Sequence, residues 1–176
     1  RNILGLPAEG KVLYLTFGGG GDADVQAALA VSLEALQRIQ SLHVAVAAGP
    51  LFHGTLRSTK CITPVSYFPM SELFTAFDAA ISAAGYNSTM ELLHHGVPTA
   101  LVPFPRQVDD QEERARQLAE AGVALFVRTL EPQQIHDAAL ELLDEQKARR
   151  MSDAARAMVP SSGADRAAES ILGLLG

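Results

Sequence analysis

Residues 85–91, with the sequence GYNSTME, carry groups suited to binding a phosphorylated ligand. They follow an apolar run and precede an amphipathic one, so a strand should end here and a helix begin. Asn87, Ser88 and Thr89 would add short polar side chains to the unpaired amides of that helix N-terminus, where the helix dipole favours anions. Glu91, about one turn further, has a carboxylate that can accept hydrogen bonds from a sugar diol. The alternative is structural, because Ser88 and Glu91 also fit a capping box.

Four consecutive glycines at residues 18–21 form a second candidate segment, since glycine lets backbone amides approach a ligand closely. From Gly18 the chain also matches the G-x-G-x-x-A fingerprint of dinucleotide-binding proteins. That fingerprint requires an acidic residue about 20 positions later for the ribose. No Asp or Glu occurs between Glu34 and Glu72, which argues against nicotinamide dinucleotides. Alternatively, the glycines only make a tight turn.

A third polar segment is residues 103–111, PFPRQVDDQ, which also follows an apolar run. Asp110 and Gln111 have the carboxylate and amide groups that hydrogen-bond sugar hydroxyls, and Arg106 adds a positive charge. The structural alternative is that Asp110 caps the next helix, with Glu113 at its third position.

Apolar runs of strand length alternate with amphipathic helical patterns along the whole chain. Near-continuous apolar strands indicate a parallel sheet covered by helices on both faces. We therefore expect a single α/β domain with a three-layer, Rossmann-like, doubly wound parallel sheet of about six strands. The expected strands are 11–17, 42–47, 61–67, 79–83, 99–102 and 123–127. The expected helices are 24–40, 71–77, 88–95, 110–121, 132–146, 147–158 and 164–175.

Ligands of open parallel sheets bind at the carboxyl ends of the strands. Each of the three polar segments directly follows an expected strand. The loops after Phe17, Ala83 and Val102 are therefore the ones that we expect to form the site.

The composition restricts the functional class. The 176 residues are 48% apolar and 19% charged, as in soluble globular domains, and the net charge of −6 argues against nucleic-acid binding by phosphate neutralisation. No apolar run is long enough to span a membrane. Cys61 is the single cysteine, and no signal peptide is evident, so we expect a cytoplasmic location, no metal site and no bound cofactor. The chain begins at Arg1, and we expect residues 1–10 to be a linker from a preceding domain.

Together the three segments resemble the donor-binding, C-terminal half of GT-B fold glycosyltransferases. The similarity rests on the pattern F-x-x-x-D-x-x-I-S-x-x-G-Y-N-S-T-x-E from Phe74 to Glu91, on G-V-P at 96–98, on Pro103 and on D-Q-x-x-R-A from Asp110 to Ala115. It extends from about residue 11 to residue 127. Similar families are the peptidoglycan N-acetylglucosaminyltransferases that make lipid II and the UDP-glucuronosyl and plant glucosyltransferases.

The resemblance implies that the chain binds a nucleotide diphosphate sugar, with UDP as the expected nucleotide, for hexosyl transfer. The residues that it implies are Gly19, Gly20 and Gly21 facing the diphosphate; Gly85, Asn87, Ser88 and Thr89 on phosphate oxygens; Glu91 on the ribose; Tyr67 and Phe68 at the base; and Asp110 and Gln111 on the transferred sugar. This chain has Ala83 where plant-type members have a histidine, so the phosphate pocket would rely on amides and hydroxyls, with Arg106. The glycine loop also lacks the Ser and Gln of the peptidoglycan enzymes.

The resemblance also implies an incomplete enzyme. Its members generally take the general base from an N-terminal, acceptor-binding domain, here expected from a preceding domain or a partner subunit. We therefore expect the isolated chain to bind donor without transferring it, and residues 159–176 to pack against that other half. An acceptor at a membrane surface is compatible with this resemblance. Alternatives are a sugar-nucleotide hydrolase or 2-epimerase of the same fold, and a non-catalytic nucleotide-sugar-binding module.

Overall fold

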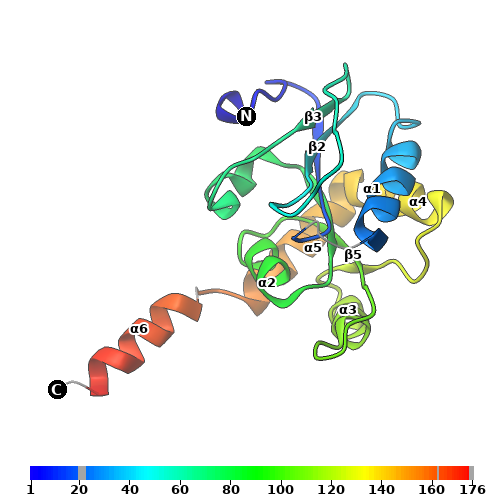
Figure 1. The fold of residues 1–176 in the computed structure, drawn as a ribbon. Helices are drawn as coiled ribbons and strands as arrows, with labels where there is room; N and C mark the ends of the chain where they lie inside the picture. The colour runs from blue at the N-terminus through cyan, green and yellow to red at the C-terminus, as the bar shows by residue number, and fades with distance from the viewer. Residues whose placement is uncertain (20–22, 162, 175–176) are drawn as a thin grey trace.

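The computed structural model describes residues 1–19, 23–161 and 163–174 (Figure 1). Within them, six strands form a parallel sheet in the order β3-β2-β1-β4-β5-β6. The strands are β1 Lys11–Thr16, β2 Leu42–Ala47, β3 Ile62–Pro64, β4 Ala79–Ala83, β5 Thr99–Val102 and β6 Leu125–Phe126. The expected doubly wound α/β fold is confirmed.

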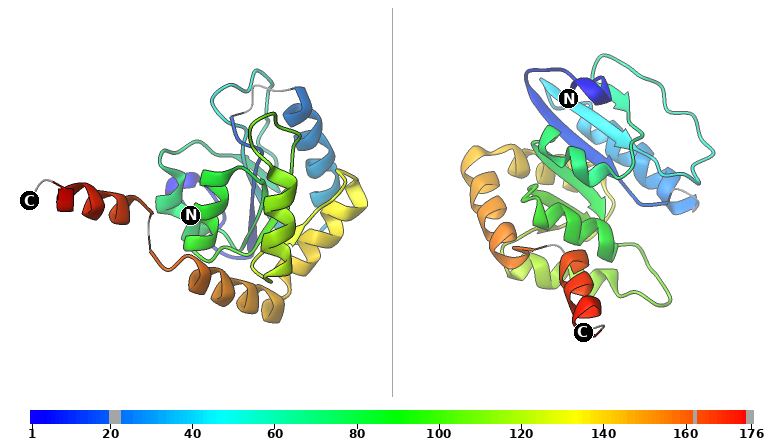
Figure 2. Two further views of the ribbon diagram at one scale, coloured as in Figure 1. Left: turned by 90° about the horizontal axis from the view of Figure 1, so that it is seen from below. Right: turned by 90° about the vertical axis from the view of Figure 1, so that its left-hand side faces the viewer.

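Helices cover both faces of the sheet (Figure 2). They are the 3₁₀ helices η1 Asn2–Leu4 and η2 Met70–Ala76, and the α-helices α1 Ala23–Leu36, α2 Tyr86–His94, α3 Gln111–Glu120, α4 Pro132–Leu143, α5 Glu145–Met158 and α6 Gly163–Leu174. Helices α1 and α4 pack on one face, whereas η2 and α2 pack on the other. None of the helices described is long and apolar enough to cross a membrane.

Strand β1 shows why the apolar runs are nearly continuous. Leu13 and Leu15 pack toward α1 and α4, while Val12 and Tyr14 pack toward η2 and α2. The Tyr14 ring stacks on Phe77 with ring centroids 4.7 Å apart. Because successive side chains of a strand point to opposite faces, a strand covered on both sides must be apolar at every position.

The expected bounds of β2, β4 and β5 are correct, but β3 and β6 are shorter than predicted. Both are edge strands, each hydrogen-bonded to one neighbour in the described sheet. Strand β3 ends at Pro64, a residue that an edge strand tolerates, and the Val65 amide makes one further bond, to the Val46 carbonyl oxygen at 2.9 Å. The apolar residues Val65 and Tyr67 follow Pro64, so the sequence pattern extends past the end of the strand.

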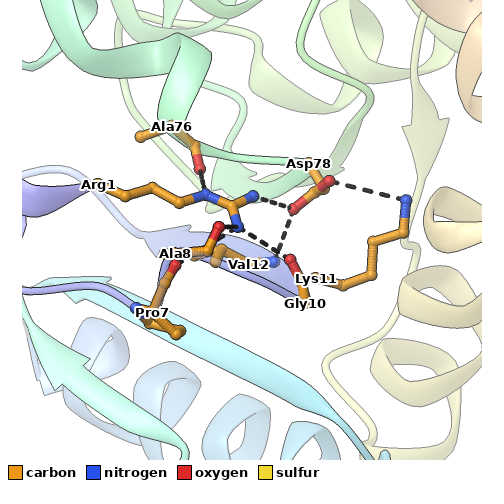
Figure 3. Close-up of polar contacts among 8 residues, drawn as sticks. All are labelled: Arg1, Pro7, Ala8, Gly10, Lys11, Val12, Ala76 and Asp78. Carbon is orange, nitrogen blue, oxygen red and sulfur yellow. Dashed lines mark hydrogen bonds and ion pairs between the residues drawn. The ribbon is translucent and has the colours of Figure 1, made fainter.

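The N-terminal segment packs onto the domain at the amino ends of β1 and β4 (Figure 3). The Arg1 guanidinium donates to the carbonyl oxygens of Ala76 and Gly10, at 2.9 Å each, and to Asp78 Oδ2 at 2.8 Å. The same Asp78 oxygen accepts the Val12 amide at 2.8 Å. Leu4 and Leu6 are buried. Residues 1–10, expected to be a linker, are thus folded against the sheet, and a connection to another domain stays a prediction.

Helix α6 extends away from the rest of the chain (Figures 1 and 2). Each of its side chains that the structure describes is exposed. Among them are Ile171, Leu172 and Leu174, which are 59%, 67% and 86% exposed. The helix therefore carries apolar side chains that the described part of this chain leaves uncovered.

Candidate functional site

The strand order places the three polar segments side by side. Progress along the sheet reverses between β1 and β4, which is the topological switch point where ligands of doubly wound sheets bind. Strand β5 pairs with β4 on its other side. The loops that follow β1, β4 and β5 consequently lie along one edge of the sheet, as the sequence predicts.

The turn between β4 and α2 leaves the start of the helix open. Gly85 is the N-cap in an extended conformation, with φ −65° and ψ 142°, and no side chain caps the helix. Because α2 begins at Tyr86, Ser88 and Glu91 lie inside it, so the capping-box interpretation is wrong. The amides from Gly85 to Ser88 have no carbonyl partner within the helix.

Space and polar groups surround this turn. A Cβ added to Gly85 would meet no atom within 4 Å, so the backbone amides are accessible from that side. Asn87 is exposed and Ser88 is half-buried. The Thr89 hydroxyl is buried and has no hydrogen-bond partner among the residues that the structure describes. The turn therefore offers donors that local structure does not consume.

The loop after β1 is supported by the loop after β2. Gly18 has φ +84°, a conformation that favours glycine, and the Gly19 carbonyl accepts the Leu51 amide at 2.8 Å. Gly49, with φ +83°, packs directly against the Gly18–Gly19 backbone. The predicted diphosphate residues Gly20 and Gly21 lie outside the described residues.

The loop after β5 borders a hollow of about 820 Å³, which Arg106, Asp110 and Gln111 help to line. Asp110 Oδ1 accepts the Glu113 amide at 3.0 Å, so Asp110 is a helix cap. Gln111 is buried, and its Oε1 accepts the Phe104 amide at 3.0 Å. Both side chains already hold the loop in shape, and their contacts with a sugar stay predictions.

A second hollow, of about 590 Å³, includes Tyr67 and Phe68 in its wall, together with Tyr14 and Gly49. Phe68 is 96% exposed. The Tyr67 hydroxyl donates to Glu72 at 3.1 Å, and this carboxylate raises the pKa of Tyr67. Burial raises the pKa of Tyr14 to about 12, so its hydroxyl stays neutral and can donate a hydrogen bond. Tyr67 and Phe68, which are predicted to contact the nucleotide base, thus line a hollow large enough for a ligand.

Glu91 is exposed on α2 and borders a third, smaller hollow of about 280 Å³, which His94 and His95 also line. Its charge contributes to the raised pKa of Tyr14. Burial lowers the pKa of His95, and the Glu91 charge opposes this effect. The Glu91 side chain therefore borders the same hollow as Ser71 of η2.

Sequence reasoning missed three residues of this edge. Tyr14 is one position of an apolar strand, and Gly49 lies outside the three polar segments that the sequence singles out. Arg114 occurs in the D-Q-x-x-R-A pattern without a role, yet it bonds to the β4–α2 turn. Chain-local patterns carry no signal for such contacts between distant loops.

Residues 15–170 match the model of the glycosyltransferase family 28 C-terminal domain. The chain belongs to this family. The matched region includes each of the three loops at the carboxyl edge, and the predicted resemblance to GT-B glycosyltransferases is thereby confirmed.

Curated relatives of this family 28 domain are bacterial enzymes. The chain is 29% identical, over 99% of its length, to the UDP-N-acetylglucosamine--N-acetylmuramyl-(pentapeptide) pyrophosphoryl-undecaprenol N-acetylglucosamine transferase of Salinibacter ruber. It is 32% identical, again over 99% of its length, to the enzyme of the same name from Desulforudis audaxviator. It covers 49% and 50% of these proteins, so it spans about half the length of the curated relatives it matches.

Solved structures agree on the fold. The calicheamicin glycosyltransferase superposes with a TM-score of 0.73 at 23% identity, covering 97% of this chain and 45% of that protein. The spinosyn forosaminyltransferase SpnP gives a TM-score of 0.73 at 19% identity, covering 92% and 42%. The family 28 domain therefore has the fold of GT-B C-terminal halves.

Proposed function

We propose that this family 28 domain binds a nucleotide diphosphate sugar, most simply a UDP-sugar, as the donor half of a hexosyltransferase. The observation that carries the proposal is the open N-terminus of α2 at the switch point, where Gly85 exposes unpaired amides. A helix N-terminus with free amides favours a phosphate group through both hydrogen bonds and the helix dipole. The curated relatives are named for transfer from UDP-N-acetylglucosamine, which favours UDP as the nucleotide.

The diphosphate would lie between the glycine loop and the β4–α2 turn. Charge builds on this leaving group as the bond to the sugar breaks, so fixed amide donors stabilise the transition state. Each such donor typically contributes about 2.7–4 kcal/mol when it is preorganised. In this proposal Gly19, Gly20 and Gly21 act from one side, and Gly85, Asn87, Ser88 and Thr89 act from the other.

The remaining parts of the donor follow from the hollows. The base occupies the 590 Å³ hollow beside Tyr67 and Phe68. The ribose hydroxyls bind Glu91. Its carboxylate is exposed and makes no capping hydrogen bond at the start of α2. The transferred sugar enters the 820 Å³ hollow, where Arg106, Asp110 and Gln111 lie.

The acceptor and the general base belong to another part of the enzyme. We propose that an N-terminal acceptor-binding half, in the same protein or in a partner subunit, supplies both, and that this chain alone does not transfer the sugar. The apolar side chains of α6 would pack on that half.

Calorimetric titration of the chain with UDP, UDP-N-acetylglucosamine, UDP-glucose, dTDP and GDP tests the proposal. We expect dissociation constants below about 1 mM for the uridine ligands, and weaker binding of dTDP and GDP. A folded sample that binds none of them near millimolar concentration would overturn the assignment. When the other half is supplied, transfer to acceptor is expected, whereas release of free monosaccharide would support the hydrolase or 2-epimerase.

A further inference from the structure

One side chain on α3 joins two of the candidate loops. Arg114 Nη1 donates to the carbonyl oxygen of Ala84 at 2.6 Å. The same guanidinium pairs with both carboxylate oxygens of Asp109, one of them 3.2 Å from Nη1. Its Cζ atom also lies 5.5 Å from the centre of the Tyr86 ring. A single planar group thus has partners in the β4–α2 turn and in the loop after β5.

These partners flank residues of the proposed donor site. Ala84 precedes the N-cap Gly85, and Tyr86 is the first residue of α2. Asp109 precedes Asp110 and Gln111. Fixing Ala84, Tyr86 and Asp109 therefore fixes the direction of the open amides relative to the 820 Å³ hollow.

The environment makes this contact more than a surface ion pair. The side chains of Arg114 and Asp109 are 19% and 31% exposed, so water screens them only partly. A guanidinium that pairs bidentately with a carboxylate holds a defined geometry, which a lysine ammonium cannot reproduce. The far side of the loop is held separately by the bond from the Phe104 amide to Gln111.

We propose that Arg114 is a positioning residue of the donor site, which holds the β4–α2 turn against the loop after β5. This inference rests on the proposed donor binding. Arg114 acts through Ala84 and Asp109 rather than by touching the ligand, and Asp109 offsets its charge. Amide donors gain their effect from being oriented before the ligand arrives, so loosening the turn should weaken binding.

The test compares Arg114→Ala, Arg114→Lys and Asp109→Asn with a matched control, Arg116→Ala. Arg116 lies on the same helix and pairs with Glu113 and Glu120, outside the contact between the two loops. Affinity for UDP and amide hydrogen exchange of the peptide spanning residues 84–94 are measured on each folded variant. We expect Arg114→Ala to weaken UDP binding roughly tenfold and to accelerate exchange in that peptide.

The other variants refine the result. Arg114→Lys should recover part of the affinity, because lysine can reach one partner but cannot bridge both. Asp109→Asn, which keeps the bond to Ala84, should weaken binding by a smaller factor, and it serves if Arg114→Ala does not fold. Arg116→Ala should bind UDP within about twofold of the unmodified chain.

Two outcomes would separate failure of this inference from failure of the donor assignment. If the unmodified chain binds UDP and the folded Arg114 variants bind equally well without a change in exchange, positioning by Arg114 is overturned while donor binding stands. If the unmodified chain binds no nucleotide, the donor assignment fails, and the positioning role for ligand binding fails with it.

Discussion

Gly49 packs against the backbone of Gly18, where the loops that follow β2 and β1 meet: a Cβ added to Gly49 would lie 2.1 Å from the Gly18 carbonyl oxygen. No real Cβ approaches a carbonyl oxygen so closely, so the two loops are in contact only because residue 49 has no side chain. The Leu51 amide, which donates to Gly19, secures the same contact.

We therefore predict that Gly49→Ala destabilises the chain and displaces the glycine loop. An alanine at φ +83° should lower the free energy of unfolding by about 1–2 kcal/mol, which corresponds to a fall in Tm of roughly 2–8 °C. The steric overlap with the Gly18 backbone should lower the stability further. Gly122→Ala is the control, because Gly122 has a φ of +71° but open space around its Cα. Thermal melts that show equal losses for both variants would contradict the importance of the overlap.

Gly85→Ala, in contrast to Gly49→Ala, should weaken ligand binding without lowering the stability of the chain. Its backbone conformation suits any residue and an added methyl group meets no atom within 4 Å, so the Tm should hardly change. The methyl group would nevertheless occupy the space beside the amides that we assign to the diphosphate. Calorimetry should show UDP binding weakened by roughly tenfold. Unchanged affinity would place the diphosphate elsewhere.

Glu91→Gln tests the ribose contact. The residue is exposed, so the free energy of unfolding should change by less than about 0.5 kcal/mol. Loss of a charge-assisted hydrogen bond should weaken UDP binding by about 10-fold or more. Inorganic pyrophosphate, which has no ribose, should bind as before, and Glu120→Gln on the exposed surface of α3 should leave both affinities unchanged. Equal loss for UDP and pyrophosphate would argue against a ribose contact.

The Arg114–Asp109 pair predicts a pH dependence. The hydrogen bond from Arg114 lowers the pKa of Asp109 in the folded chain. A lowered pKa stabilises the fold above the ordinary aspartate pKa of about 3.9, and this stabilisation is lost as the pH falls through the lower folded value. The difference in Tm between the unmodified chain and Asp109→Asn should thus be present at neutral pH and shrink in acid. In an Arg114→Ala background the pH dependence of this difference should become smaller, because only Gln111 and Arg106 then remain to lower the pKa of Asp109. An unchanged pH dependence there would contradict a role for Arg114.

Helix α6 predicts self-association of the isolated chain. With Ile171, Leu172 and Leu174 exposed, sedimentation velocity should show oligomers that grow with protein concentration. Ile171→Glu combined with Leu174→Glu should reduce them and leave the Tm unchanged, since the described side chains of α6 are exposed. A chain that stays monomeric at high concentration would contradict an uncovered docking face.

The sequence alone determined the fold class and the edge of the sheet at which three polar segments meet. Burial on both faces requires continuous apolar strands, so the apolar runs predicted the bounds of β2, β4 and β5. The polar segments after β1, β4 and β5 predicted which loops meet at the carboxyl edge of the sheet. The helix cap at Asp110 was also predictable from the sequence, because it depends on an amide only three positions away.

Only the tertiary structure decided which side chains remain available at that edge. Gly85, not Ser88, is the N-cap of α2, because its backbone has the extended conformation of an N-cap residue. The amide of Gln111 turns inward to Phe104, and Arg114 reaches across to Ala84, 30 residues away in sequence. Periodicity reports how deeply a residue is buried, whereas its partner depends on which strands become neighbours in the sheet. The order of the strands depends on the packing of the whole chain, so a local sequence pattern does not predict it.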